Sequence, residues 1–330
     1  MEINNSEGIH ILLLGCMSSG KSTILNALLG SGIFPAGNRA TTAQVFKVVH
    51  DPDCTENVCR SVLGQKEWQP LTKKLLEACN SSKSDKLSTE VRVLMPFLQK
   101  RRSVVFYDTP GPNTSKHGEH REKTYYALEN LPVTNIFLVL DMAQLHTRDE
   151  EELLKDIGRV VLSRGDDMSV LVLLNKADVI DIEKESVKDI MADVHLTVQS
   201  YLPASTRVDV LPLMAKGAEV WRRMVARDNM TVFEVEFGQY IDWRLCLEGI
   251  KNSMIPEKIR ESMLEQLDEW EKMQKFSKAF KSTLDYLSRR VHPGAELINK
   301  NMSKILDYAD CRRAIVGSGI VALEEYIDAL

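Results

Sequence analysis

The chain is poor in cysteine and has no close cysteine pairs. Its 330 residues include 6 cysteines, at positions 16, 54, 59, 79, 246 and 311, without a C-x-x-C spacing. This scatter argues against a disulfide framework and against a structural zinc site. It predicts a reduced chain with a cytoplasmic location.

Long apolar runs are also missing. The longest apolar stretch near the carboxyl end, 314–323, is interrupted by Gly317 and Gly319 and is far shorter than the ~20 residues that span a bilayer. The polar residues 4–8 break the amino end, so no signal peptide is expected. The sequence therefore predicts no transmembrane segment, while peripheral contact with a membrane stays open.

Excess basic charge is the third absence. The net charge is −5 and the isoelectric point is near 5.9, which argues against nucleic acid as the direct ligand, since phosphate-backbone binding needs a basic face. A hydrophobic content of 44% is enough for a sizeable core, and the length suggests about two domains.

What the chain does have is a phosphate-binding loop. The apolar run 9–14 leads into GCMSSGKS at 15–22, which matches G-x-x-x-x-G-K-[ST]. The glycines let the backbone turn its N–H groups toward phosphate, and the helix that follows adds partial positive charge. Lys21 should reach the β- and γ-phosphates, and the Ser22 hydroxyl should bind Mg2+. The predicted nucleotide-binding residues of this loop are Gly15, Ser18, Ser19, Gly20, Lys21, Ser22 and Thr23.

A second apolar strand, 104–106, leads into the D-x-x-G sequence at 108–111. Asp108 is expected to hold Mg2+ through a water molecule, and the Gly111 N–H is expected to contact the γ-phosphate during hydrolysis.

The base is predicted from an N-K-x-D sequence at 175–178, which follows the apolar strand 170–174. The Asp178 carboxylate can accept hydrogen bonds from N1–H and the 2-amino group of guanine, which adenine does not offer, so Asn175, Lys176 and Asp178 favour GTP over ATP by about 10⁴-fold or more. A further strand, 207–211, ends near Ala215 and Lys216, which are expected to close over guanine through their backbone.

These motifs resemble those of the dynamin superfamily of GTPases, particularly its bacterial members, over roughly residues 9–225. The resemblance is carried by SSGKST at 18–23, NRATTA at 38–43, DTPGPN at 108–113, and Leu140-Asp141 with Gln144-Leu145. The last three stretches are most similar to the branch that includes the dynamin-like GTPase known for binding the replication sliding clamp. The resemblance implies that Thr42 in switch I completes the Mg2+ shell and holds the attacking water.

The hydrolysis mechanism depends on the residue after Gly111. Ras-type GTPases place a water-orienting glutamine there, whereas this chain has Pro112. The resemblance implies that Ser18 takes this role, with a monovalent cation, Na+ or K+, and that dimerisation of two GTPase domains completes the site. Ser18 as a plain loop residue stays open, and so does Arg39 as either a catalytic or a solvated side chain.

The predicted fold class is α/β, a P-loop GTPase domain with a mostly parallel sheet flanked by helices, followed by a helical bundle or neck. The domains are expected at 1–235, with an insertion at about 51–90, and at 236–330. Within the insertion, 71–79 is predicted to be helical, and 91–94 with 103–107 are predicted to form an antiparallel pair. The insertion is either a tolerated surface excursion or an interaction surface beside switch I. In the second domain, the apolar spacing of Met263, Leu267 and Trp270 predicts a helix.

The loop 142–150 follows a strand at the carboxyl edge of the sheet, where α/β proteins bind ligands. The resemblance to dynamins implies that this loop contacts a second copy of the chain across a head-to-head dimer. The loop carries Gln144, His146, Arg148 and Asp149. The alternative is a solvated loop in which Asp149 caps the following helix.

Two functions therefore compete. The first is an enzyme that hydrolyses GTP to GDP and phosphate and is activated by head-to-head homodimerisation. The second is a slow regulatory switch or scaffold that acts through a protein effector, for example in replication or chromosome segregation.

Overall fold

A computed structural model describes residues 8–35, 44–61, 67–80, 89–98, 103–112, 118–164, 168–180, 186–226, 243–288 and 309–330. The switch I residues Arg39 and Thr42 lie outside these ranges, as does the predicted domain boundary at 235/236.

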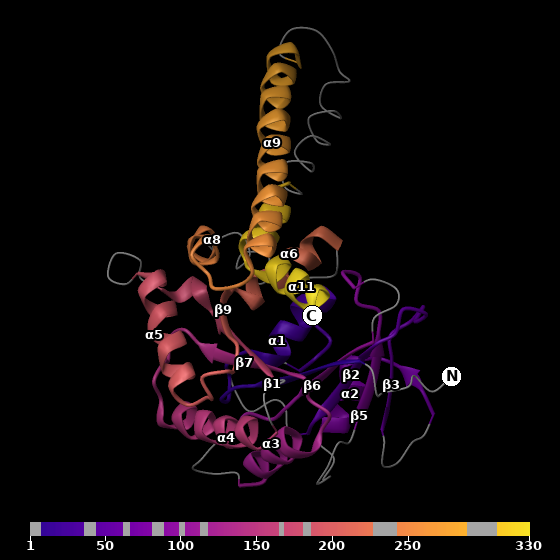
Figure 1. The fold of residues 1–330 in the computed structure, drawn as a ribbon. Helices are drawn as coiled ribbons and strands as arrows, with labels where there is room; N and C mark the ends of the chain where they lie inside the picture. The colour runs from indigo at the N-terminus through magenta and orange to yellow at the C-terminus, as the bar shows by residue number, and fades with distance from the viewer. Residues whose placement is uncertain are drawn as a thin grey trace.

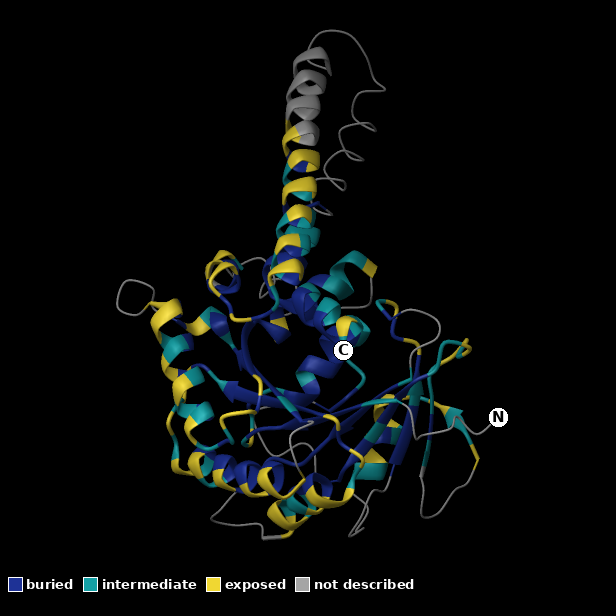
Figure 2. Cartoon of the chain, in the orientation of Figure 1, coloured by how far each residue is buried: buried dark blue, intermediate teal, exposed yellow. Residues whose placement is uncertain are grey.

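The described strands form one nine-stranded sheet in the order β4-β3-β5-β2-β6-β1-β7-β8-β9. The strands are β1 (Ile9–Leu14), β2 (Phe46–His50), β3 (Val58–Ser61), β4 (Gln69–Pro70), β5 (Thr89–Val93), β6 (Val104–Asp108), β7 (Asn135–Asp141), β8 (Ser169–Asn175) and β9 (Val208–Leu213). From β6 through β1, β7 and β8 to β9 all neighbours are parallel. Parallel strands are covered on both faces, so these strands are rich in apolar residues and are buried (Figure 2).

Helices cover both faces of this sheet (Figure 1). On one side lie α1 (Lys21–Leu29), α6 (Ala215–Ala226) and α11 (Ile320–Ala329), and on the other lie α3 (Gly118–Asn130) and α4 (Arg148–Arg164). The α5 helix (Val187–Ser200) packs against β9. The short helices are α2 (Lys73–Asn80), the 3-10 turn η1 (Ala177–Val179) and α8 (Arg244–Lys251). The predicted fold class is confirmed.

One predicted strand pair is wrong. β5 and β6 do run antiparallel, but they do not pair, because β2 lies between them, parallel to β5 and antiparallel to β6. The other side of β5 pairs with β3. The insertion therefore extends the sheet, and the predicted helix within it is confirmed as α2.

The long helix α9 (Glu257–Ser288) starts after Pro256 and projects from the body (Figure 1). Its predicted apolar residues Met263 and Leu267 are buried, while most of its described surface is exposed or half-buried (Figure 2).

The last helix, α11, returns to the body of the molecule. The buried Tyr326 hydroxyl donates to Asp209 of β9 at 2.7 Å, and Glu324 forms an ion pair with Arg222 of α6 at 2.6 Å. Just before α11, the Ser318 carbonyl accepts from the Met214 N–H at 2.9 Å. The carboxyl-terminal residues thus contact the strand that leads to Ala215 and Lys216.

Candidate nucleotide-binding site

The P-loop joins β1 to α1 through backbone conformations that favour glycine. Gly15 and Gly20 have φ of 152° and 102°. A Cβ at Gly15 would lie 2.3 Å from the Val139 carbonyl oxygen, and one at Gly20 would lie 2.1 Å from the Asn175 amide nitrogen. Both glycines are therefore required by close approach to neighbouring strand ends, as well as by their backbone angles.

Ser18 is one of three non-glycine residues with positive φ in the described chain; the others are His146 and Lys176. Such conformations cost about 1–3 kcal/mol and cluster at functional sites. Two of the three lie within the predicted nucleotide motifs, and the third lies in the loop predicted to reach a second copy.

The Lys21 side chain curls over the loop. Its ammonium group donates to the carbonyl oxygens of Gly15 at 2.7 Å and Cys16 at 3.1 Å. Burial lowers the pKa of Lys21, and the nearby Asp108 opposes that shift. Burial also raises the pKa of Cys16 to about 12, so this thiol adds no negative charge to the P-loop at neutral pH.

Ser22 and Asp108 provide hard oxygen ligands at the predicted metal position. The Ser22 hydroxyl donates to Asp108 Oδ2 at 2.8 Å. The other carboxylate oxygen, Oδ1, is buried and has no hydrogen-bond partner within the described residues. Burial raises the pKa of Asp108 to about 6, so the carboxylate is mostly ionised at neutral pH. A buried anionic oxygen with spare bonding capacity beside a serine hydroxyl fits Mg2+.

The D-T-P-G turn is pressed against the P-loop. The buried Thr109 hydroxyl donates to the Leu13 carbonyl at 2.7 Å. A Cβ on Gly111 would lie 2.6 Å from both the N and Cα atoms of Met17. Gly111 is thus placed directly beside the P-loop. The sequence motifs do not predict this contact between Thr109 and β1, although Thr109 lies inside the D-x-x-G sequence.

Asn175 connects three segments. Its amide donates to the Ser19 carbonyl at 2.9 Å and accepts from the Ala215 N–H at 3.1 Å. The end of β8 is thereby fixed to the P-loop and to the start of α6.

The rest of the N-K-x-D turn, which is predicted to bind the base, follows directly after Asn175. Lys176 has φ of 63° and forms an ion pair with Asp141 at the end of β7. Burial raises the pKa of Asp178 in η1. Lys216, in the first turn of α6, forms an ion pair with the buried Glu219 at 3.1 Å. Asp141 belongs to the motifs named above, but its contact with Lys176 was not predicted.

The loop after β7 is held by contacts at its end. Thr147 and Glu150 form a reciprocal cap of α4, with Glu150 N to Thr147 Oγ1 at 3.3 Å and Thr147 N to Glu150 Oε2 at 3.1 Å. The alternative in which Asp149 caps the helix is wrong in that detail, because α4 begins at Arg148 and Asp149 lies inside it. The T-x-x-E spacing of Thr147 and Glu150 is that of a capping box.

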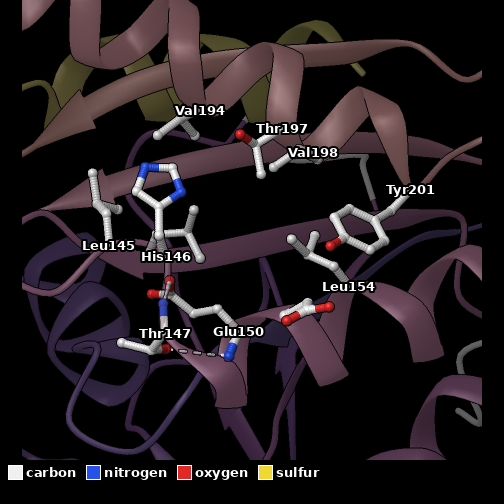
Figure 3. Close-up of a pocket in the computed structure, with 11 residues that line it drawn as sticks. Leu145, His146, Thr147, Glu150, Leu154, Val194, Thr197, Val198 and Tyr201 are labelled. Atoms are coloured by element: carbon white, nitrogen blue, oxygen red, sulfur yellow. Dashed lines mark hydrogen bonds between the residues drawn. The ribbon is translucent and has the colours of Figure 1, made fainter.

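A pocket of about 150 Å³ lies beside this loop, between α4 and α5 (Figure 3). His146 stands at one end, where its Nε2 atom lies 2.9 Å from Asp193 of α5. The lining residues are Leu140, Leu145, His146, Thr147, Glu150, Glu151, Leu154, Val194, Thr197, Val198 and Tyr201. None of them is a predicted nucleotide-binding residue.

Within the described ranges, no group of three or more histidine, cysteine, aspartate or glutamate residues could hold a metal ion. No helix in that part of the chain is long and apolar enough to cross a membrane.

Comparisons with known proteins agree with the motifs. The sequence profile of the dynamin family matches residues 11–177. A curated relative, described as an uncharacterized protein in the xynA 3′ region of Caldicellulosiruptor sp. (strain Rt8B.4), is 23% identical over 239 residues. The alignment covers 70% of this chain and 56% of the relative, so this chain spans little more than half of that protein.

The solved structures that the chain resembles in fold include the following two. One shows an oligomerised bacterial dynamin pair, described as providing a mechanism for long-range sensing and tethering of membranes. It is 17% identical, with a TM-score of 0.48 over 90% of this chain and 46% of that one. The other is Era from Aquifex aeolicus bound to GDP·AlF4⁻, which is 18% identical, with a TM-score of 0.35 over 62% of this chain and 50% of that one.

Proposed function

The chain belongs to the dynamin family, and we propose that it hydrolyses GTP to GDP and phosphate, with turnover raised when two GTPase domains meet in a nucleotide-dependent homodimer. We also propose that residues 1–235 form the GTPase domain and 236–330 a helical neck. One observation carries the enzymatic proposal. The P-loop, the D-x-x-G turn and the N-K-x-D turn converge at the carboxyl edge of one sheet, where Asn175 joins two of them.

Each end of GTP has a matching set of groups. At the base, Asp178 accepts from guanine, while Asn175 orients the turn and the Ala215–Lys216 backbone closes over the ring. At the phosphates, the N–H groups of the P-loop and the Lys21 ammonium group bind oxygen atoms. Ser22, Thr42 and, through a water molecule, Asp108 would hold Mg2+, which would neutralise phosphate charge.

Water positioning is assigned to Ser18 and Thr42. Pro112 is buried and carries neither a side-chain amide nor an N–H group, so it cannot orient the attacking water. We assign that role to the Ser18 hydroxyl, with Na+ or K+ beside it, and to the Thr42 carbonyl. The Gly111 N–H binds the γ-phosphate as charge develops on it.

The first test is nucleotide choice. Wild-type protein should hydrolyse GTP in the presence of excess ATP, and Asp178→Asn should shift the preference to xanthosine triphosphate. The new amide can donate to the 2-carbonyl that replaces the 2-amino group of guanine. Equal competition by ATP and GTP in the wild type would contradict the assignment.

The second candidate function is a slow switch that acts through a protein effector, and Pro112 is the observation that favours it. The two functions respond differently to concentration. An enzyme activated by homodimerisation gains specific activity as its concentration rises, whereas a switch that awaits a separate activator does not. Turnover measured at two protein concentrations, each with and without liposomes, separates the two and tests peripheral membrane contact.

The identity of an effector is a further proposal. The stretches 38–43, 108–113 and 140–145 resemble the branch that includes the dynamin-like GTPase known for binding the replication sliding clamp. The test is binding of purified clamp to this chain in the presence of GTPγS and of GDP. Absence of binding in both states would remove this assignment and leave the GTPase proposal intact.

A further inference from the structure

Thr124, in the second turn of α3, makes a contact that the nucleotide motifs do not predict. Its side chain is 3% exposed, and its hydroxyl lies 2.7 Å from the Pro110 carbonyl oxygen. The same hydroxyl lies 2.9 Å from the His120 carbonyl of its own helix. It has one proton to donate, and the shorter contact is the one to Pro110.

The consequence follows from peptide geometry. The Pro110 carbonyl and the Gly111 N–H belong to one peptide plane, and no described peptide bond is cis. In a trans peptide these two groups point in opposite directions. A helix that holds the carbonyl therefore also sets the direction of the Gly111 N–H, which points away from α3.

The other side of this peptide is the P-loop. Gly111 packs so closely on Met17 that a Cβ would lie 2.6 Å from its backbone. The turn is held from below by Thr109, which donates to Leu13, and by Asp108, which accepts from Ser22. Among these contacts, the bond from Thr124 is the one made to the Pro110–Gly111 peptide itself.

The same turn of α3 also reaches the end of switch I. The ammonium group of Lys123 lies 3.4 Å from the side-chain oxygen of the buried Gln44, two residues beyond Thr42. Neighbouring residues of one helix thus contact both segments that would surround the γ-phosphate.

We propose that Thr124 is a positioning residue for GTP: through the Pro110 carbonyl, it aims the Gly111 N–H at the γ-phosphate and so separates the affinity for GTP from that for GDP. This inference rests on the proposed GTPase function. GDP has no γ-phosphate, so its binding does not use this N–H. A purely structural role for Thr124 would affect both nucleotides alike.

The test measures dissociation constants for GTPγS and GDP, with Mg2+, in four proteins. Thr124→Val keeps the shape and removes the donor, and it should weaken GTPγS binding by about tenfold, the effect of one lost hydrogen bond, while GDP affinity stays within about twofold. Thr124→Ser restores the donor and should restore GTPγS binding. Thr134→Val is the control for loss of a threonine hydroxyl elsewhere: Thr134 is exposed, and its hydroxyl is bonded to the His10 backbone at the opposite end of β1.

Two results would overturn the inference: unchanged GTPγS affinity in Thr124→Val, or an equal loss for both nucleotides. If Thr124→Val does not fold, Thr124→Ala removes the same donor with a smaller side chain and is judged by the same criterion. Wild-type protein that binds neither nucleotide would overturn the proposed function itself, and this inference with it.

Discussion

Lys21 and Ser18 lie on the same loop but are expected to act at different stages of the reaction. Lys21 is buried and its ammonium group donates to loop carbonyls. Ser18, in the same loop, has a strained backbone conformation with φ of 64°. The roles of the two side chains can therefore be distinguished by measuring nucleotide affinity and turnover separately.

We expect Lys21→Ala to lower GTP affinity by about 10- to 100-fold, because a charge-assisted contact with phosphate contributes about 1.5–3 kcal/mol. Ser18→Ala should leave affinity nearly unchanged and lower turnover by about 10²-fold, the scale of a misplaced reacting group. Fluorescent-nucleotide titration and phosphate release measure the two quantities. Equal loss of affinity in both variants would contradict the catalytic role given to Ser18.

His50, at the end of β2, is expected to make the stability of the protein depend on pH. Its Nδ1 atom accepts from the Met95 N–H at 3.1 Å, and burial lowers its pKa. The unfolded chain therefore binds a proton at a higher pH than the folded chain does. The stabilising contribution is complete above the unfolded pKa of about 6.5 and is lost as pH falls toward the lower folded value.

The expected result is that His50→Gln reduces the difference in free energy of unfolding between pH 7 and pH 5. Urea unfolding of wild type and variant at both pH values measures this difference. An unchanged difference would assign the acid sensitivity of the protein to other groups.

At the scale of elements, two glycines at helix boundaries have similar backbone angles but different surroundings. Gly30 ends α1 with φ of 65°, and an added Cβ would meet only the Arg222 side chain, at 3.7 Å. Gly319 precedes α11 with φ of 84°, and its Cβ would lie 2.4 Å from the Pro212 carbonyl oxygen. At Gly30 only the left-handed backbone conformation disfavours a side chain, whereas at Gly319 a side chain would also clash with the β9 backbone.

We expect Gly30→Ala to cost about 1 kcal/mol of stability, the penalty of the left-handed conformation alone. Gly319→Ala should cost about 3 kcal/mol or more, because α11 must also move away from β9. Urea unfolding of the two variants gives the comparison. Similar costs would mean that the turn before α11 relaxes without loss.

At the scale of the whole molecule, the arrangement separates a nucleotide-binding body from the projecting helix α9 (Figure 1). The loop between β7 and α4 stands at the carboxyl edge of the sheet and includes the strained residue His146. A two-fold pairing of GTPase domains would bring the same loop from both copies together.

We predict that GDP with aluminium fluoride dimerises the protein through this loop and switch I, while GDP alone leaves it monomeric. Gln144→Ala should weaken the dimer, whereas Lys272→Ala, on the exposed surface of α9, should not. Multi-angle light scattering measures the mass in each state. A monomer with both ligands would count against the dimer mechanism and favour the switch.

Much of the nucleotide site follows from short sequence patterns, because each pattern is a local device. A strand, a glycine turn and a helix start within about ten residues suffice to point N–H groups at phosphate. Ser22, Asp108 and Asn175 were predicted in this way, and the structure brings them to the same edge of the sheet.

Other features depend on contacts between residues far apart in the chain. β2 enters between β5 and β6 because strand order is settled by packing across the whole sheet. Tyr326 reaches Asp209 across 117 residues, and Thr124 holds Pro110 from a helix that no motif includes. The motifs by themselves determined the ligand chemistry, because backbone angles and side-chain types act locally. The tertiary structure alone decided that the buried Thr124 hydroxyl contacts the Pro110 carbonyl, because that contact requires α3 and the D-x-x-G turn to pack against each other.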